Sequence, residues 1–201
     1  MKMPESKLAV ILAIWACLIG LCYYALIAYS AVSGTQVHAN HSKIWPQVET
    51  NTLARHKGRF TLVTFIHPHC PCSRASLNEL NKIMTRTHNN MDCQIVFLKP
   101  STFGTNWEKS DLWQMSSDIP NSLRISDLNG LIAKSFNAST SGQTFLYDPD
   151  DKLVFSGGVT SARGHEGDSP GGIAIENLAS EKKATSRCSQ VFGCPLFENK
   201  I

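Results

Sequence analysis

The fold of this chain is decided by a nine-residue stretch that reads Phe65-Ile66-His67-Pro68-His69-Cys70-Pro71-Cys72-Ser73. Residues 59–66 are rich in β-branched and aromatic side chains and form a run short enough for a buried strand. Residues 73–84 repeat apolar side chains at helical spacing. The sequence therefore predicts that two histidines and two cysteines lie in a turn between a core strand and the first turn of a helix.

Two cysteines at the start of a helix suit redox chemistry. The unpaired backbone N–H groups and the helix dipole favour negative charge there, which lowers the pKa of a thiol and favours the reactive thiolate. A protonated His67 or His69 would act in the same direction. We predict Cys70, as the more exposed thiol, to be the attacking nucleophile and Cys72 to be the resolving thiol. A disulfide between them would close a small, strained and easily reduced ring.

The N-terminal segment predicts a membrane anchor. Residues 8–29 carry no charged side chain and match the ~20 residues that cross the hydrocarbon core of a bilayer. Lys2 and Lys7 precede this segment, so the positive-inside tendency keeps the N-terminus cytoplasmic and exports the rest of the chain. The alternative is a signal peptide cleaved after Ser30, although signal cores usually span only ~7–15 residues. Both interpretations export the domain that follows.

The composition fits one globular domain with extensions. The 201 residues are 42% hydrophobic and 17% charged, and the net charge of +3 is too small and too scattered to indicate binding to nucleic acid. Seven cysteines are too few for a disulfide-dense scaffold of this length. We divide the chain into an anchor at 1–30, a linker at 31–41, a folded domain at 42–180 and a cysteine-containing tail at 181–201.

The folded domain alternates predicted strands and helices. Residues 93–98 form a second core strand, and the strand–helix–strand order predicts a parallel βαβ unit with a right-handed crossover. The further predicted elements are a weak strand at 122–126, a helix at 128–136 with Asp127 as its N-cap, hairpin strands at 143–147 and 152–156, and a final helix that includes 173–178. This order is typical of an α/β fold.

A βαβ unit with a Cys-Pro-Cys turn, followed by a hairpin and a closing helix, resembles the thioredoxin fold over residues 42–180. The turn itself, with residues 140–144, 157–167 and 191–195, looks like bacterial membrane-anchored thioredoxin-like proteins of the RedB type. The resemblance implies a three-layer α/β sandwich with helices on both faces of a mixed sheet. It also implies a bacterial inner-membrane protein with a periplasmic domain that performs thiol–disulfide exchange and requires no cofactor. The implied partners are protein thiols or disulfides, such as those of a respiratory or cytochrome assembly component.

Two positions depart from the thioredoxin pattern. The family dithiol is Cys-x-x-Cys with a proline before its second cysteine, so Pro71 and Cys72 match it, whereas Cys70 matches only if one residue is deleted. Gln143 stands where thioredoxins carry a cis-proline. A cis bond before a non-proline residue costs about 2.5–4 kcal/mol, so we expect a trans peptide there.

Gln143, Arg163 and His165 are candidates for substrate binding or proton supply. Arg163 and His165 belong to a glycine-rich loop at 160–172, and this loop follows the hairpin strand that lies beside the dithiol in the thioredoxin fold. We therefore expect the loop to lie near the cysteine turn.

Three cysteines lie outside the turn and the anchor. Cys188 and Cys194 most simply form a local disulfide that ties the tail in an oxidising compartment. The alternative is that Cys194 docks near Cys70 and exchanges with it. Cys93 starts a core strand and is predicted to be buried and inert.

Other functions remain open at this point. Cys70, Cys72 and His165 offer sulfur and imidazole ligands that suit copper, which would make the chain similar to thioredoxin-fold copper carriers for oxidase assembly. A thiol-dependent peroxide reductase and a tethered, non-catalytic interaction module are further alternatives. The sequence contains no glycine-rich nucleotide loop, His-Glu-x-x-His motif or Cys-x-x-Cys-His haem site, which argues against the chemistries that those motifs carry.

Overall fold

The computed structural model divides the chain into two compact units, Met1–Val32 and Ser33–Ile201. The residues that the structure describes are 4–34, 45–46, 53, 55–56, 58–87, 90–180, 182, 184 and 186–197. Most of the linker predicted at 31–41 lies outside these residues.

Helix α1, Glu5–Ala31, forms the first unit. An 18-residue window within Ser6–Ala31 has a mean hydropathy of 2.4 and is not buried by any other part of the protein. Among the described residues, α1 is the one helix long and apolar enough to cross a membrane. An N-terminal signal sequence shares these properties, so the helix fits either interpretation of the N-terminal segment.

The second unit is built around a five-stranded mixed sheet with the strand order β3-β2-β1-β4-β5. The elements in chain order are β1 (Phe60–Ile66), α2 (Ser73–Thr87), β2 (Met91–Lys99), α3 (Asp111–Met115), the 3₁₀ helix η1 (Ser116–Asp118), β3 (Ser122–Leu128), α4 (Leu131–Ser135), β4 (Gln143–Tyr147), β5 (Leu153–Gly157) and α5 (Pro170–Ala179). Strands β1, β2 and β3 are parallel, whereas β4 runs antiparallel to both β1 and β5. The predicted βαβ unit and hairpin are both present.

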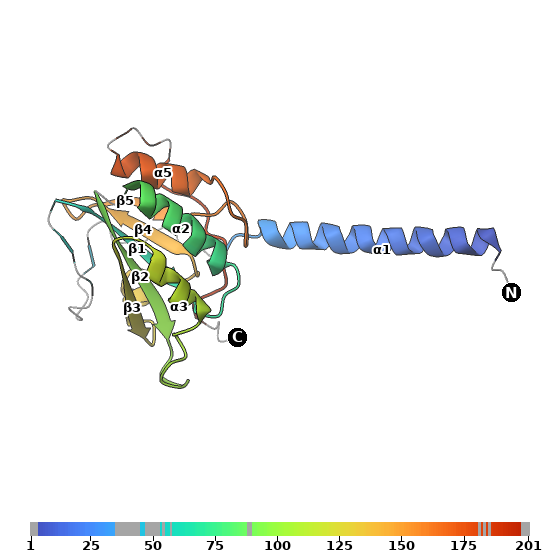
Figure 1. The fold of residues 1–201 in the computed structure, drawn as a ribbon, viewed down its shortest axis with the longest axis horizontal. Helices are drawn as coiled ribbons and strands as arrows, with labels where there is room; N and C mark the ends of the chain where they lie inside the picture. Colours follow the sequence, from blue (N-terminus) through green and yellow to red (C-terminus); the bar gives the residue numbers. More distant parts are fainter. Residues whose placement is uncertain are drawn as a thin grey trace. The chain divides into compact units, whose positions relative to one another are not determined.

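Strand β1 lies at the centre of the sheet and is buried on both faces. Successive side chains of a strand point to opposite faces, so Leu62 and Ile66 enter one core and Val63 and Phe65 enter the other. The first core lies under α2, α3 and α5, which Figure 1 shows together on one face of the sheet. The second core lies under α4. The structure thus confirms the predicted three-layer, thioredoxin-like α/β fold.

The predicted helix at 128–136 is shorter than expected. Strand β3 continues to Leu128, and α4 begins only at Leu131 because a turn with left-handed residues at Asn129 and Gly130 intervenes. Asp127 is not the N-cap residue. Its buried carboxylate nevertheless accepts hydrogen bonds from the N–H groups of Ile132 and Ala133, at 2.8 and 2.9 Å, and so satisfies two donors of the first helical turn.

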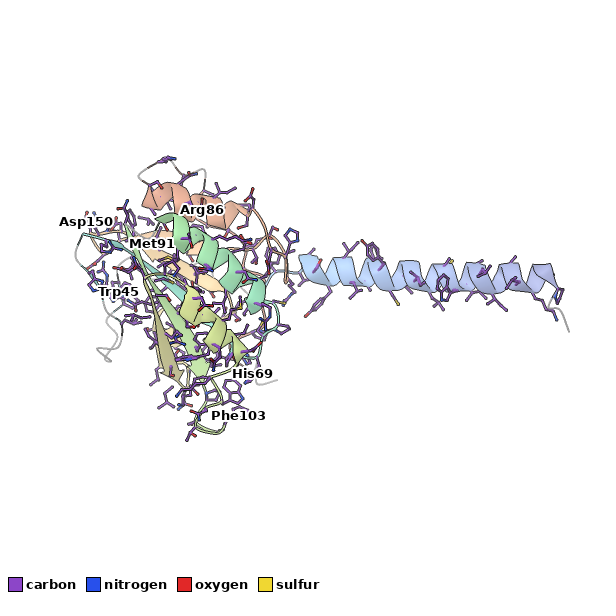
Figure 2. The ribbon with its side chains drawn as sticks, viewed as in Figure 1. Trp45, His69, Arg86, Met91, Phe103 and Asp150 are labelled. Carbon is purple, nitrogen blue, oxygen red and sulfur yellow. The ribbon has the colours of Figure 1, made fainter. Side chains whose placement is uncertain are left out.

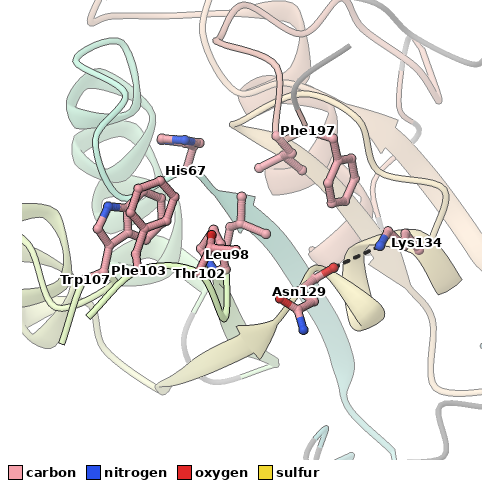
Figure 3. A pocket seen from close by; sticks show the side chains of 10 residues that line it. His67, Leu98, Thr102, Phe103, Trp107, Asn129, Lys134 and Phe197 are labelled. Atoms are coloured by element: carbon pink, nitrogen blue, oxygen red, sulfur yellow. Dashed lines mark hydrogen bonds between the residues drawn. The ribbon is translucent and has the colours of Figure 1, made fainter. Parts of the chain in front are cut away.

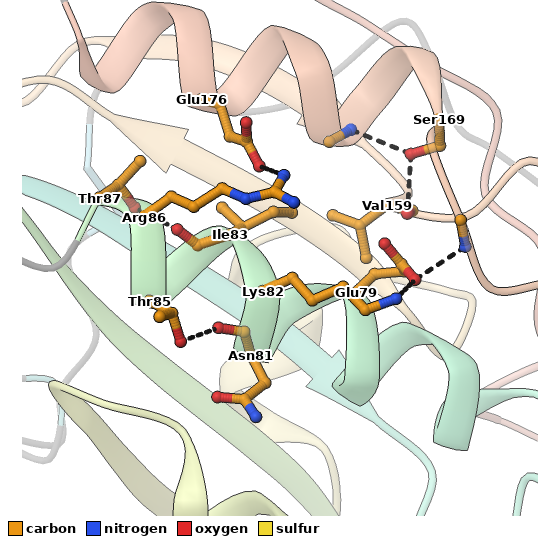
Figure 4. A network of polar contacts seen from close by, with 12 residues as sticks. Glu79, Asn81, Lys82, Ile83, Thr85, Arg86, Thr87, Val159, Ser169 and Glu176 are labelled. Carbon is orange, nitrogen blue, oxygen red and sulfur yellow. Dashed lines mark hydrogen bonds and ion pairs between the residues drawn. The ribbon is translucent and has the colours of Figure 1, made fainter.

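A polar network joins α2 to the glycine-rich loop and to α5 (Figure 4). Glu79 is almost fully buried, and its carboxylate accepts a hydrogen bond from the N–H group of Gly167 at 2.8 Å and pairs with Lys82 at 2.7 Å. Arg86 pairs with Glu176 of α5 at 2.8 Å. The network fixes one end of the loop that carries Arg163 and His165.

A buried ion pair fixes the loop after β2. Lys99 lies 2.8 Å from Glu108, whose side chain is fully buried and also accepts a hydrogen bond from Ser126 at 3.0 Å. Burial alone would raise the pKa of this carboxyl, but the hydrogen bonds from Lys99, its own backbone and Ser126 hold the pKa below its ordinary value. The neighbouring Trp107 is thereby brought to the cysteine turn.

Candidate active site

The cysteine turn connects the end of β1 to the start of α2. Within it the N–H group of Cys70 donates to the carbonyl of His67, and the N–H group of Ser73 donates to the carbonyl of Cys70, both at 3.0 Å. The hydroxyl of Ser141 accepts from the N–H group of His67 and lies within hydrogen-bonding distance of the Ser73 hydroxyl, at 2.7 Å in each case. Ser141 therefore ties the turn to the segment that precedes β4.

The C-terminal tail brings a third cysteine onto this turn. The sulfur atoms of Cys70 and Cys194 lie 2.9 Å apart, and the N–H group of Cys194 points at the Cys70 sulfur from 3.4 Å. Backbone hydrogen bonds of 2.8 Å from Ser141 to Cys194 and from Leu196 to Ser139 hold the tail in place. Two positions were predicted for Cys194, and the structure places it against Cys70.

Cys188 does not form the predicted local bridge with Cys194. Both thiols are free, and Cys188 lies exposed beside Ser156 of β5, where Ser186 is its hydrogen-bonding neighbour. The tail is tied instead by its backbone hydrogen bonds and by the burial of Val191, Phe192 and Leu196.

The sequence predicted Cys70 to be the more exposed of the two turn cysteines, and this prediction was wrong. Cys70 is only 1% exposed, whereas Cys72 and Cys194 are both half-buried. Cys194 covers Cys70, and a contact across 124 residues leaves no local trace in the sequence.

The surroundings of Cys70 favour its thiolate. Burial opposes ionisation, but hydrogen bonds from the thiol and the N–H group of Cys194, and from the hydroxyl and the N–H group of Ser73, outweigh burial and lower the pKa of Cys70. The N–H group of Ser73, the first residue of α2, is a helix-terminus donor of the kind that the sequence predicted, and the Ser73 hydroxyl is a further donor. A positive charge on His67 is not the cause, because burial and the neighbouring His69 lower the pKa of His67 and favour its neutral form.

The other two thiols of the site are harder to ionise. Burial, the hydrogen bond to Cys70 and the charge of Cys70 raise the pKa of Cys194 to about 12. Burial and the charge of Cys70 also raise the pKa of Cys72. Arg163 acts against both shifts, and its guanidinium donates to the carbonyl of Gly193 at 2.7 Å. Cys70 is thus the thiol of the cluster that ionises most readily, and Arg163 is the cation beside Cys72 and Cys194.

Alkylation should reveal this order of thiol pKa values. Iodoacetamide reacts with thiolates, so a lowered pKa predicts that alkylation of Cys70 in the reduced protein reaches half its maximal rate at a lower pH than that of Cys72. In Cys194→Ala the thiol donor is lost, the pKa of Cys70 rises and its midpoint moves to higher pH. Mass spectrometry of the alkylated peptides across a pH series measures both midpoints. An unchanged Cys70 midpoint in Cys194→Ala would show that Cys194 does not stabilise the thiolate.

Aromatic side chains surround the two histidines of the turn. His67 and His69 both pack edge-on against Trp107, with ring centroids 5.4 and 4.6 Å away, and Trp107 stacks on the exposed Phe103. Figure 2 shows His69 and Phe103 at one end of the domain, away from Asp150.

A cavity of about 520 Å³ lies between Trp107 and the tail residue Phe197 (Figure 3). A second cavity, of about 300 Å³, has Cys70 and His69 in its wall.

Gln143, which the resemblance places at the thioredoxin cis-proline position, is the first residue of β4. The described chain contains no cis peptide bond, so the expected trans peptide before Gln143 is present. The side-chain carbonyl of the buried Gln143 accepts from the N–H groups of Ser139 and Thr140, at 2.9 and 3.4 Å. This side chain shapes the loop on which the tail docks, and its burial leaves it little access to a substrate.

The copper alternative names Cys70, Cys72 and His165 as ligands, and it stays a prediction. Among the residues that the structure describes, no group of three or more His, Cys, Asp or Glu side chains is arranged to hold a metal ion. The side chain of His165 is exposed on the glycine-rich loop, and it does not form a ligand set with Cys70 and Cys72.

Cys93 is fully buried in β2, where burial strongly raises its pKa, in agreement with the prediction that it is buried.

Sequence reasoning missed Ser73, Ser141 and Gly193 as parts of the site. Any side chain at Gly193 would collide with the carbonyl oxygen of Ser141, so only glycine allows the tail to approach this closely. The signal was present in Gly193-Cys194-Pro195, where a glycine precedes a cysteine in an apolar segment. The partner of that segment was not readable from it.

Two solved structures share the fold of this chain with TM-scores above 0.5. A conserved protein from Geobacillus kaustophilus is similar with a TM-score of 0.60 and 16% identity, over 85% of this chain and 94% of that one. A hypothetical protein from Sinorhizobium meliloti is similar with a TM-score of 0.58 and 18% identity, over 83% of this chain and 94% of that one. A putative thioredoxin from Neisseria meningitidis has a TM-score of 0.46 and 13% identity, over 65% of this chain and 80% of that one. No protein-family model and no curated protein sequence matches the chain.

Proposed function

We propose that this protein is a membrane-tethered thiol–disulfide oxidoreductase whose reacting pair is Cys70 and Cys194. The observation that carries the proposal is the 2.9 Å separation of the two sulfur atoms at the start of a helix, with the Cys70 thiolate stabilised by hydrogen bonds. This pair replaces the Cys70–Cys72 dithiol expected from the sequence. Cys194 and Cys72 both lie within hydrogen-bonding reach of Cys70, but a bridge to Cys72 must close a strained ring across one residue.

Exchange proceeds by attack of a thiolate on a disulfide sulfur. In the oxidised protein a partner thiolate attacks the half-buried sulfur of Cys194, the Cys70–Cys194 bond breaks, and Cys70 leaves as a thiolate. The second thiolate of the partner then attacks the partner's own sulfur in the mixed disulfide and releases Cys194, which takes up a proton. Two electrons pass from the partner dithiol to the protein. The reverse sequence reduces a partner disulfide.

The asymmetry of the pair favours the first direction. Stabilisation of the Cys70 thiolate stabilises the reduced protein and makes the disulfide a better oxidant. Cys70 is also the better leaving group, because the thiol with the lower pKa leaves faster. We therefore propose that oxidation of partner dithiols is the preferred reaction.

The proposed setting is the outer face of a bacterial inner membrane. The long apolar helix α1, together with Lys2 and Lys7 ahead of its uncharged part, supports an anchored domain on the exported side. An oxidising compartment also suits a reversible disulfide. The proposed partners are exported protein thiols, including those of respiratory or cytochrome assembly components.

Disulfide mapping of the oxidised full-length protein tests the pairing. After oxidation with diamide and blocking of free thiols in acid, we expect the main linked peptide pair to join Cys70 to Cys194, with Cys72 blocked. Cys72→Ser should retain this link and Cys194→Ser should lose it. A dominant Cys70–Cys72 link in the wild-type protein would restore the pair predicted from the sequence and reject Cys194 as the reacting partner.

A further inference from the structure

The cavity of about 520 Å³ beside the cysteine turn is lined by aromatic rings on two sides. Figure 3 shows Trp107 and Phe103 on one side and the tail residue Phe197 on the other. Trp107 and Phe103 are stacked, with their ring planes 12° apart and their centroids 5.0 Å apart. The volume falls within the range of about 300–1,000 Å³ that is typical of small-molecule sites. The cavity therefore suits a flat ring that stacks or packs edge-on against these side chains.

The Trp107 side of the cavity is fixed by the contacts of its backbone. The N–H group of Trp107 donates to the carbonyl of Gly104 at 3.1 Å, and its carbonyl accepts from Nε2 of His69 at 3.1 Å. The next residue, Glu108, is the buried partner of Lys99. A ligand would therefore meet this wall already in place, which reduces the entropic cost of binding.

The polar groups that line the cavity are mainly hydrogen-bond donors. The Nδ1 atom of His67 accepts from the N–H group of His69 at 3.2 Å, so the neutral ring carries its proton on Nε2. The side-chain carbonyl of Asn129 accepts from the N–H group of Ser101 at 2.8 Å, which leaves the amide N–H groups of Asn129 as donors. Lys134 adds an ammonium group, and the described residues that line the cavity include no acidic side chain. The lining therefore favours a ligand with acceptor atoms and negative charge.

Lys134 supplies the positive charge of the cavity. Its ammonium group donates to the carbonyl of Asn129 at 3.0 Å and lies 5.3 Å from the centre of the Phe197 ring. Among the described residues no carboxylate forms an ion pair with it, and the carboxylate of Asp127 is engaged by N–H groups of α4. An ammonium group has three protons to donate, so donors remain for a ligand. Its single charge balances one carboxylate, whereas a phosphate, with a charge of about −1.5 to −2 at neutral pH, would stay partly uncompensated.

We propose that this cavity is a binding site for a small aromatic carboxylate, with the ring of the ligand between Trp107 and Phe197 and its carboxylate on Lys134. The two halves of the inference rest on separate observations. The ring is inferred from the aromatic side chains on both sides of the cavity, and the charge is inferred from an ammonium group without an acidic partner. Binding requires no redox step, so the inference goes beyond the proposed function and does not depend on it.

Ligand-observed fluorine NMR of the full-length protein in detergent tests the charge. The probes are a naphthoate that carries one fluorine atom and the corresponding neutral naphthamide, which has the same ring system and nearly the same shape. We expect the wild-type protein to bind the naphthoate at least about fivefold more tightly than the naphthamide, because only the naphthoate pairs with the ammonium group. Lys134→Met should remove this preference, since it deletes the charge and keeps an apolar stem.

The matched control is Lys152→Met, which deletes an exposed charge in the turn between β4 and β5 and should preserve the preference. Each probe partitions into the detergent equally for every variant, so a change in the ratio of the two affinities reports on the protein. Lys134 is exposed on α4, and its substitution should leave the fold intact.

Trp107→Leu tests the ring and should weaken the binding of both probes by at least about fivefold, because it removes one aromatic side of the cavity. Equal affinities of the wild-type protein for the two probes, or a preference that survives in Lys134→Met, would overturn the inference. A dissociation constant of the naphthoate above about 1 mM, or one that Trp107→Leu leaves unchanged, would do the same. The Lys134 comparison remains decisive even if Trp107→Leu fails to fold. None of these measurements involves a thiol, so a failure here leaves the proposed function intact.

Discussion

Cys70→Ser is expected to lower the rate of thiol–disulfide exchange by at least about a hundredfold, because it removes the stabilised thiolate on which the exchange depends. Serine preserves the size of the side chain and its buried position, so the loss should be one of chemistry. The measurement is the rate at which the oxidised full-length protein accepts electrons from a dithiol peptide, followed by the appearance of free thiols.

The matched control for this prediction is Cys188→Ser. Cys188 is exposed, lies outside the reacting cluster and should leave the exchange rate within about twofold of the wild type, as surface substitutions generally do. Retention of the full exchange rate in Cys70→Ser would exclude Cys70 as the nucleophile. Equal losses in both variants would point to a general effect of serine on the fold.

Phe65→Ala is expected to lower the free energy of unfolding of the domain by about 3–5 kcal/mol, the usual cost of removing a buried aromatic ring. Phe65 is 1% exposed at the end of β1, and its ring packs against Phe136 and Phe145 with centroids 5.3 and 5.9 Å away. Its carbonyl also accepts the hydrogen bond of the Gly142 N–H group, at 2.7 Å. The substitution leaves a cavity directly behind the cysteine turn.

Urea unfolding of the full-length protein in detergent, followed by circular dichroism, measures the change. Phe103→Ala is the matched control, because Phe103 is 54% exposed and should change the free energy of unfolding by less than about 0.5 kcal/mol. Similar stabilities of the two variants would contradict the placement of Phe65 in the second core.

Most of the fold was predictable because its signals are local. The β-branched run at 59–66, the helical spacing after Ser73 and the Asp148–Asp151 turn each identify an element without reference to the rest of the chain. The prediction was wrong for the start of α4, where the strand pairing of β3 with β2 extends to Leu128 and delays the helix. The narrower RedB-type resemblance stays a prediction.

The candidate site was only partly predictable, because some of its contacts join residues that are far apart in the sequence. The sequence identified Cys70 as a thiol at a helix N-terminus, and it left open whether Cys194 meets Cys188 or Cys70. It misjudged the exposure of Cys70 and the source of its stabilisation. Both depend on the tail, whose contacts cross 124 residues of chain.

The sequence by itself determined the class of protein: an apolar N-terminal segment, a thioredoxin-like α/β domain, and a cysteine held at a strand-to-helix turn. Only the tertiary structure decided which thiol faces that cysteine and what shields it from solvent. Periodicity and helix-terminus electrostatics act over a few residues and are therefore readable from the chain. The tail pairs with the loop Ser139–Ser141 through backbone hydrogen bonds, which any sequence can make. The location of this pairing therefore depends on the folded arrangement of β1, β4 and the loop between α4 and β4.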